Sequence, residues 1–292
     1  MIRASDKRFR AALVQLRSGR DADANVRSAE ALIRRAAEGG AAYVQTPENT
    51  AMMELKPERV LEAAETEEAS APLARLRALA AELGIFLHIG SLAIRLDGTR
   101  VANRSYLIDP EGRIAARYDK LHLFDVDLAG GESYRESDTA RAGATAIVAE
   151  LPFGRLGLSI CYDLRFAALY RALALAGAEF IAVPAAFTKQ TGEAHWHVLI
   201  RARAIETGTF VLAAAQGGLH ENGRSTYGHS LIVSPWGEIL AEGGEAPGVV
   251  FADIDLAASA EARARIPALK HSRDFEVAIA GPDPEAARKE AS

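Results

Sequence analysis

Three ionisable side chains that could act together in catalysis, Glu48, Lys120 and Cys161, each follow an apolar stretch of the 292-residue chain. Cys161 is the only cysteine. It ends the apolar run 156–160, typical of a buried strand, and the residues that follow, up to Leu175, have the pattern of a helix. Backbone N–H groups and the positive end of a helix dipole at such a turn favour the nucleophilic thiolate. A lone cysteine is more often a buried structural residue, so the interpretation depends on the other two residues.

Glu48 and Lys120 each follow a predicted strand. Glu48 comes after residues 41–46 and Pro47, at a carboxyl end where layered α/β proteins often carry active-site groups. Burial there would raise the pKa of the carboxyl group and let it act as a base near neutral pH. Lys120 follows the predicted strand 114–118 in an apolar context, so its ammonium group needs a partner, for which Glu48 is a candidate. Taken singly, the two could be a turn glutamate on the surface and a snorkelling lysine.

Together, these residue types describe acyl transfer from an amide-like C–N bond to water. Glu48 can take the proton of the Cys161 thiol, which then attacks a carbonyl carbon. Lys120 and the backbone N–H of Tyr162 can stabilise the oxyanion that forms. Glu48 then protonates the leaving amine and activates the water that hydrolyses the thioester.

Several segments resemble the nitrilase superfamily of carbon–nitrogen hydrolases, and the resemblance covers nearly the whole chain. The strongest matches are Lys120–Asp125 (KLHLFD), Cys161–Phe166 (CYDLRF), Ala194–Glu206 and Tyr227–Ser230. The resemblance implies a Glu-Lys-Cys triad formed by Glu48, Lys120 and Cys161. It also implies an α/β fold, a four-layer α-β-β-α sandwich that forms a homodimer or a larger homo-oligomer, and a hydrolase that uses no metal and no cofactor.

The superfamily carries a second glutamate between its lysine and its cysteine. Glu136 matches this residue better than Glu132 does, and the resemblance gives it a supporting role, holding Lys120 or the substrate amine. A solvated loop acid is the open alternative. The chain departs from the family at Ala167 and Ala168, where Pro-Glu is common. Since Pro is favoured in the first turn of a helix, this change is expected to cost only a little local stability.

Within the superfamily, the chain resembles the branch of omega-amidases and deaminated glutathione amidases. The segments 213–218 and 227–230 favour the deaminated glutathione amidase side. The branch implies hydrolysis of a small carboxylated amide, either deaminated glutathione or the omega-amide of a 2-oxo acid. An N-carbamoyl compound, an aliphatic amide or a nitrile remains an alternative substrate, and a non-catalytic scaffold or thiol sensor is a third interpretation.

Arg165 is the candidate for binding a substrate carboxylate. It lies four residues after the nucleophile, about one helical turn away. The alternative is an ion pair between Arg165 and Asp163 or another acid. Phe187 and Thr191 follow the next predicted strand, where a wall of the substrate pocket is expected.

Apolar runs and amphipathic segments alternate along the chain, often with Gly or Pro between them. Several strands are apolar on both faces, as in residues 181–183, which predicts sheets covered on both sides in a layered α/β body. No linker composition interrupts the pattern, so we expect a single domain over residues 1–292 with a polar tail from about residue 282. The predicted helices are 23–38, 73–83, 165–176, 195–207 and 256–266, and hairpins are predicted over 103–118 and 228–241.

Composition limits the partners of the protein. The net charge is −5 and the basic residues are dispersed, so neither nucleic acid nor an anionic membrane is an expected partner. One cysteine forbids an internal disulfide and agrees with a reducing compartment. The chain begins without a signal-peptide core and has no apolar run of about 18 residues, so we expect a cytoplasmic protein acting on a small molecule.

The histidines His195, His197, His220 and His229 do not follow a recognised metal-ligand spacing. His195 and His197 are two residues apart, so they face different sides of a helix. We therefore expect these side chains to contribute to packing or to support the site, and we expect no metal.

Overall fold

Two six-stranded sheets form the centre of the protein. The structure, a computed structural model, describes residues 7–128 and 131–279. In spatial order, the first sheet contains β16 (Gly248–Asp255), β1 (Arg8–Gln15), β2 (Tyr43–Gln45), β3 (Phe86–Arg95), β4 (Val101–Ile108) and β5 (Ile114–Asp119). The second contains β15 (Ile239–Glu242), β14 (Leu231–Val233), β11 (Phe210–Ala213), β10 (Phe180–Ala182), β9 (Gly154–Leu158) and β8 (Val148–Leu151).

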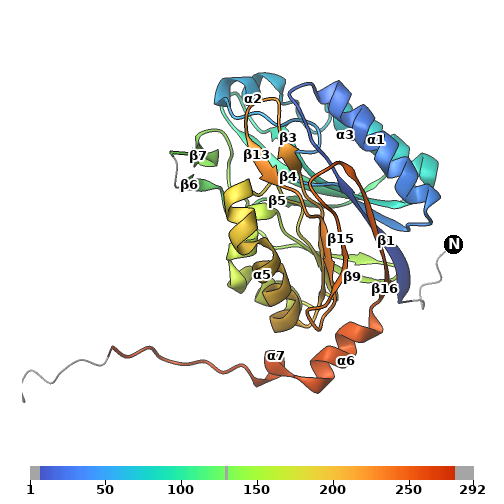
Figure 1. Cartoon of the computed structure of the whole chain (residues 1–292), viewed down its shortest axis with the longest axis vertical. Helices are drawn as coiled ribbons and strands as arrows, with labels where there is room; N and C mark the ends of the chain where they lie inside the picture. Colours follow the sequence, from blue (N-terminus) through green and yellow to red (C-terminus); the bar gives the residue numbers. More distant parts are fainter. Residues whose placement is uncertain (1–6, 129–130, 280–292) are drawn as a thin grey trace, which may run out of the picture.

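Helices cover the outer face of each sheet (Figure 1). α1 (Ala22–Glu38) and α3 (Ala71–Leu83) pack on the first sheet. α4 (Ala167–Leu175) and α5 (Lys189–Thr207) pack on the second. The resulting order of layers is α-β-β-α, as the resemblance to the nitrilase superfamily implied.

Strand β1 shows why the layers hold together. Ala11 and Leu13 lie in the core between the two sheets, whereas Ala12 and Val14 lie in the core under α1 and α3. Successive side chains of a strand point to opposite faces, so a strand that is apolar throughout is buried on both. Burying one Val or Leu side chain contributes about 1.5–3 kcal/mol.

Capping residues explain several of the helix boundaries. Asp21 caps α1 by accepting a hydrogen bond from the Ala24 N–H, and α3 ends at Gly84, whose φ of 64° is left-handed. Helix α5 starts earlier than the predicted 195, because the Thr188 side chain accepts a hydrogen bond from the backbone N–H of Thr191.

Short elements complete the described part of the chain. They are α2 (Pro57–Ala63), α6 (Ala257–Arg265), α7 (Ala268–His271), the pair β6 (Asp125–Asp127) and β7 (Ser133–Arg135), and the pair β12 (Gly217–Leu219) and β13 (Ser225–Tyr227). Among the helices of the described residues, none has the length and apolar character needed to cross a membrane. The polar tail predicted from about residue 282 lies outside the described residues.

Candidate active site

Glu48, Lys120 and Cys161 line one cavity of about 210 Å³. Glu48 lies in the loop after β2 and Lys120 directly follows β5, so both come from the first sheet. Cys161 lies just beyond β9 of the second sheet. The structure thus brings together three residues that are far apart in the sequence.

Glu48 is 3% exposed and is held through both carboxylate oxygens. Oε1 accepts hydrogen bonds from Lys120 Nζ at 2.8 Å and from Asn103 Nδ2 at 3.0 Å. Oε2 accepts one from the Ala186 N–H at 3.0 Å. Burial raises the pKa of Glu48, but the charge and hydrogen bond of Lys120 outweigh burial and leave this pKa below its ordinary value. The sequence-based expectation of a raised pKa for Glu48 is therefore wrong, because it did not include the contact with Lys120.

Gly90 of β3 leaves room for the loop that carries Glu48. A Cβ atom at this position would lie 2.2 Å from the Thr46 carbonyl oxygen and 2.4 Å from that of Pro47. The position of Glu48 thus depends on a glycine in a neighbouring strand.

Lys120 is 2% exposed and lies between two carboxylates. Its Nζ donates to Glu48 and, also at 2.8 Å, to Glu136 Oε2. Burial alone would lower the pKa of Lys120, but the negative charges of Glu136 and Glu48 raise it above its ordinary value. Lys120 therefore keeps its positive charge at neutral pH.

Glu136 contacts Lys120 directly and is not a solvated loop acid. Its Oε2 also accepts from the Phe124 N–H at 2.7 Å, and its Oε1 accepts from Asn103 Nδ2 at 2.8 Å. Asn103 thus donates to both Glu48 and Glu136. Sequence reasoning missed Asn103, which lies inside β4 and belongs to none of the recognised motifs.

Cys161 has a positive φ of 48° and is 5% exposed. It opens a 3₁₀ helix, Cys161–Arg165, and α4 begins only at Ala167. Burial raises the pKa of Cys161 well above its ordinary value, and the charge of Glu48 raises it further, whereas Lys120 lowers it. The expectation that this turn favours the thiolate is therefore wrong, because burial and the charge of Glu48 favour the neutral thiol.

Asp163 fixes the turn that carries Cys161. Its buried carboxylate accepts hydrogen bonds from the Ile160 N–H at 2.9 Å, the Tyr118 hydroxyl at 2.6 Å and the His122 N–H at 3.0 Å. The Tyr162 N–H has no hydrogen-bond acceptor among the residues that the structure describes. That donor is therefore free for a ligand, as an oxyanion donor would need to be.

Arg165 does not pair with Asp163, so that alternative is wrong. Its Nη1 lies 3.3 Å from His195 Nδ1, and its guanidinium carbon lies 5.4 Å from the centre of the Phe187 ring. Within residues 7–128 and 131–279 it forms no ion pair with an acid. Arg165, Phe187 and Thr191 line a small cavity that also contains Cys161.

Arg224 is a second arginine at the site, and sequence reasoning missed it. It lines both cavities and lies 5.0 Å above the Tyr134 ring. One guanidinium NH₂ donates to the Ala186 carbonyl oxygen at 2.5 Å, while the buried Nε has no partner among the described residues. A signal existed in the sequence, since Arg224 lies three residues before the segment 227–230 that carries the resemblance.

The positions and contacts of the four histidines agree only in part with the expectations from the sequence. His195 and His197 do face different sides of α5: His195 contacts Arg165, whereas His197 contacts Glu242. His220 is buried and its Nε2 lies 2.6 Å from Thr226 Oγ1, which is a packing role. The helix argument did not foresee that His229 lies beside Glu242 as well.

This fold and this arrangement of residues define a carbon–nitrogen hydrolase. The carbon-nitrogen hydrolase family model matches residues 10–264, and the chain belongs to that family. It is therefore a hydrolase that acts on carbon–nitrogen bonds other than peptide bonds, as the resemblance to the nitrilase superfamily implied.

Among curated proteins, the chain is 40% identical to the deaminated glutathione amidase of Yersinia enterocolitica over 91% of this chain and 94% of that protein. It is 38% identical to the deaminated glutathione amidase of Homo sapiens over 90% of this chain and 81% of that protein.

Among solved structures, the NitFhit protein of Caenorhabditis elegans matches with a TM-score of 0.85 and 37% identity, over 92% of this chain and 66% of that one. A mutant amidase from Nesterenkonia sp. AN1 matches with a TM-score of 0.78 and 27% identity, over 91% and 94% of the two chains. In that structure, the acetamide moiety of fluoroacetamide is covalently attached to the active-site cysteine.

Proposed function

We propose that this protein is an amidase that hydrolyses deaminated glutathione, or a closely related omega-amide of a 2-oxo acid, through a thioester on Cys161. One observation carries the proposal: the cavity that contains the thiol, carboxylate and ammonium groups is also lined by Arg224. A second, small cavity that shares Cys161 and Arg224 with it is lined by Arg165. Neither arginine has an acid partner among the described residues. The names of the curated relatives support the same substrate class.

The first half of the reaction forms the thioester. Glu48 takes the proton of the Cys161 thiol as the sulfur attacks the amide carbonyl carbon. Because burial and Glu48 raise the pKa of the thiol, this transfer is proposed to accompany the attack. Negative charge develops on the carbonyl oxygen, and the fixed cation of Lys120 and the free N–H of Tyr162 stabilise it.

The second half releases the products. When the C–N bond breaks, the proton held by Glu48 goes to the leaving amine. Water then attacks the thioester carbonyl carbon, with Glu48 accepting a proton again, and the thiol is restored when the C–S bond breaks. Glu136 and Asn103 position Lys120 and Glu48 through the hydrogen bonds described above.

Substrate carboxylates are proposed to bind the two arginines. Deaminated glutathione carries one carboxylate at each end, and Arg165 and Arg224 offer planar donors suited to such groups. Phe187 and Thr191 would contact the chain between the carboxylate and the amide.

A substrate panel tests the proposal. We expect the purified protein to release 2-oxoglutarate from deaminated glutathione and from 2-oxoglutaramate much faster than it turns over acetamide, an N-carbamoyl amino acid or a simple nitrile. Cys161→Ala is expected to abolish turnover, with Cys161→Ser nearly inactive. A protein that turns over none of the carboxylated amides, or a fully active Cys161→Ala variant, would contradict the proposal. Carbon dioxide released together with ammonia would identify the N-carbamoyl alternative.

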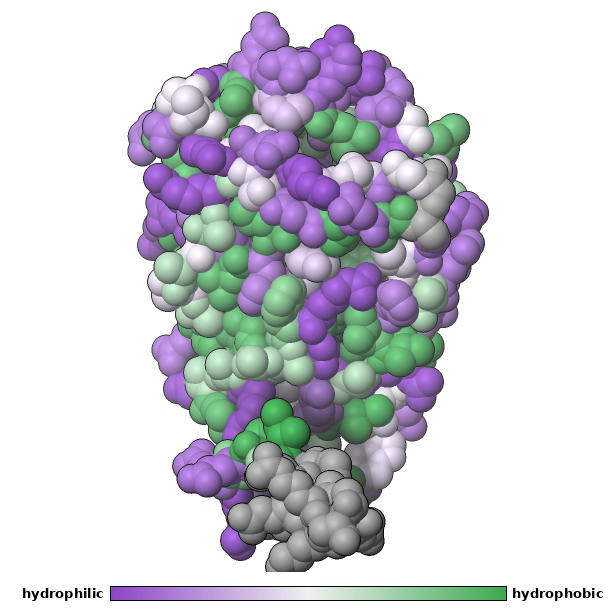
Figure 2. Space-filling model, turned by 90° about the vertical axis from the view of Figure 1, so that its left-hand side faces the viewer, coloured by the Kyte–Doolittle hydropathy of each residue, from purple (hydrophilic) through white to green (hydrophobic). Residues whose placement is uncertain are grey.

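We further propose that the chain is a single domain and forms a homodimer through α4 and α5. These helices expose large apolar side chains: Leu175 is 57% exposed, Val198 68% and Ile205 56%. Figure 2 shows apolar surface gathered on the lower half of the face that carries α5. Light scattering that gives a monomer at micromolar concentration would refute the dimer. A reactive thiol as nucleophile also supports a reducing, cytoplasmic location.

A further inference from the structure

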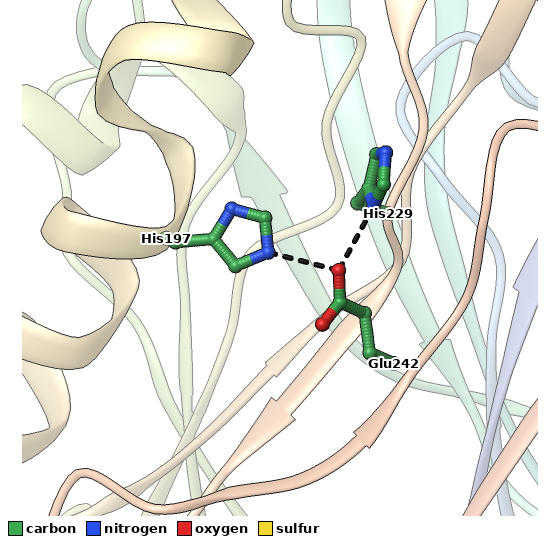
Figure 3. A group of neighbouring side chains, drawn as sticks. All are labelled: His197, His229 and Glu242. Atoms are coloured by element: carbon green, nitrogen blue, oxygen red, sulfur yellow. Dashed lines mark hydrogen bonds and ion pairs between the residues drawn. The ribbon is translucent and has the colours of Figure 1, made fainter.

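A second cluster of reactive side chains lies on the outer side of the second sheet. His197 comes from α5, His229 from the segment before β14, and Glu242 from the end of β15 (Figure 3). Glu242 Oε1 lies 3.0 Å from His197 Nε2 and 2.8 Å from His229 Nδ1. The mechanism above uses none of these groups.

We propose that His197, His229 and Glu242 form a binding site for a divalent transition-metal ion of the Zn²⁺ type. Two imidazole nitrogens and one carboxylate oxygen are ligands that Zn²⁺ prefers, and all three atoms lie within 4.8 Å of one another. Zn–N and Zn–O bonds of about 2.0–2.2 Å place neighbouring ligand atoms of a tetrahedron about 3.3–3.5 Å apart. Small rotations of the side chains therefore suffice to admit the ion.

Each of the three proposed ligand side chains is partly exposed in the single chain. The side chains of His197, His229 and Glu242 are 29%, 26% and 35% exposed. An ion can therefore enter without unfolding the site and can retain a water molecule.

The backbone and neighbouring rings hold the ligands in place. His229 adopts a φ of 53°, which its backbone hydrogen bonds support: its N–H donates to the Gly244 carbonyl oxygen and its own carbonyl accepts from Trp196 Nε1, both at 2.8 Å. The His229 ring stacks on Tyr227, with ring centres 4.3 Å apart. The fold therefore holds the ligand side chains largely in place before any ion binds.

The site carries negative charge of its own. Among the described residues, Glu242 forms no ion pair with a lysine or an arginine, so the charge of its carboxylate is available to a cation.

Binding needs no redox step. Each imidazole has one ring nitrogen within hydrogen-bond distance of the same carboxylate oxygen of Glu242. A neutral imidazole moves its proton to its other ring nitrogen and gives the ion a lone pair, whereas a protonated imidazole releases one proton to water. Affinity is therefore expected to fall as the pH is lowered.

Metal titration of the full-length protein tests the site. We would use tag-free protein with Cys161→Ser, which removes the competing thiol, and titrate it with ZnCl₂ by calorimetry and with CoCl₂ by visible absorption. The expected result is one ion per chain, with cobalt bands of a tetrahedral or five-coordinate site.

Three variants assign the ligands. His197→Ala, His229→Asn and Glu242→Gln are each expected to weaken binding by at least about tenfold, since even outer-shell partners of a metal are worth about 10–100-fold in affinity. Asn is chosen at 229 because it tolerates positive φ, and Glu242→Gln keeps the shape of the side chain. His271→Ala, on the exposed helix α7, is the matched control and is expected to bind like the parent.

Thermal unfolding gives a second readout, independent of amidase activity. Zn²⁺ is expected to raise the melting temperature of the parent and of His271→Ala, but not of the three ligand variants, because an ion that binds only the folded state stabilises it. No stoichiometric binding by the parent would overturn the proposal, and so would equal binding by all variants. Neither result would affect the proposed amidase function.

Discussion

Replacing Glu136 by Gln tests whether this residue positions the catalytic groups. The Glu136 carboxylate accepts three hydrogen bonds, from Lys120, Phe124 and Asn103. In this variant, the amide oxygen can accept from Lys120 and Phe124, but the amide NH₂ group then faces the NH₂ group of Asn103. In the parent, Asn103 Nδ2 lies 2.8 Å from Glu136 Oε1. Asn103 must then rotate, and it loses its hydrogen bond to Glu48.

The expected loss of activity follows from these contacts. A hydrogen bond to a charged group contributes about 1.5–3 kcal/mol, and each 1.36 kcal/mol is tenfold in rate, so kcat/KM should fall about 10- to 150-fold. The fall should lie mainly in kcat, because Glu136 acts through Lys120 and Glu48. Initial rates of 2-oxo acid release across about pH 6–9 measure this effect and any shift of the pH profile.

Two comparisons separate positioning from a general loss of stability. Glu132→Gln makes the same chemical change at an exposed position of the same segment and is expected to keep parental activity. Combined with Asn103→Ala, Glu136→Gln should cost less than it does alone, because the two residues share one network. A folded Glu136→Gln enzyme with kcat/KM within about twofold of the parent would refute the reasoning.

Three further predictions follow from the contacts described. Gly90→Ala is expected to lower both melting temperature and kcat, because its Cβ would lie 2.2 Å from the Thr46 carbonyl oxygen and overpacking typically costs about 1–3 kcal/mol; unchanged values in calorimetry and kinetics would contradict this. The pKa of Glu67 is lowered to about 2. The largest cause is the hydrogen bonds that Arg117 donates to it, and burial acts in the opposite direction. Glu67 therefore stabilises the fold above its unfolded pKa of about 4.3 and loses this effect as the pH falls toward 2, so Glu67→Gln should lower the melting temperature at pH 7 more than at pH 3. Arg224→Met is expected to raise KM for carboxylated amides but not for acetamide, and an equal effect on both would exclude a role in carboxylate binding.

The layered α/β body could be predicted from local patterns, whereas the grouping of Glu48, Lys120 and Cys161 was implied by the resemblance to the family. Apolar strands such as β1 are recognisable from their own residues, and Glu48, Lys120 and Cys161 each follow such a strand. The motifs around Lys120 and Cys161 then identify the family. No long-range information is needed for any of these steps.

The contact between Glu48 and Lys120 was expected from the sequence. Its effect on the pKa of Glu48 could not be predicted, because the balance between burial and the surrounding charges depends on distances that the sequence does not give. Lys120 lies 72 residues from Glu48, and the Ala186 N–H that binds the same carboxylate lies 138 residues from it. Without these partners, burial predicts a raised pKa for Glu48, and with them the pKa is lowered. Asn103 was missed for the same reason, since an Asn inside a strand carries no signal until its partners are known.

The start of α5 was missed for a different reason. Gly192 weakens helix propensity near the N-terminus of the helix. In the structure this glycine lets Tyr227 approach, since a Cβ at position 192 would lie 2.2 Å from the Tyr227 Cβ. The Thr188 cap and this contact with Tyr227 together favour the helical state of this turn, which Gly192 by itself disfavours.

If Glu48, Lys120 and Cys161 are the catalytic residues, as proposed, their division between the two sheets makes turnover sensitive to the tertiary structure. Glu48 and Lys120 belong to one sheet, Cys161 and the Ala186 N–H to the other, and Glu48 contacts both sides. A shift of one sheet relative to the other by about the length of a hydrogen bond would separate Glu48 from Cys161, although every strand would remain formed. Under mild acid or denaturant, enzymatic turnover should therefore vanish before the far-ultraviolet circular dichroism changes.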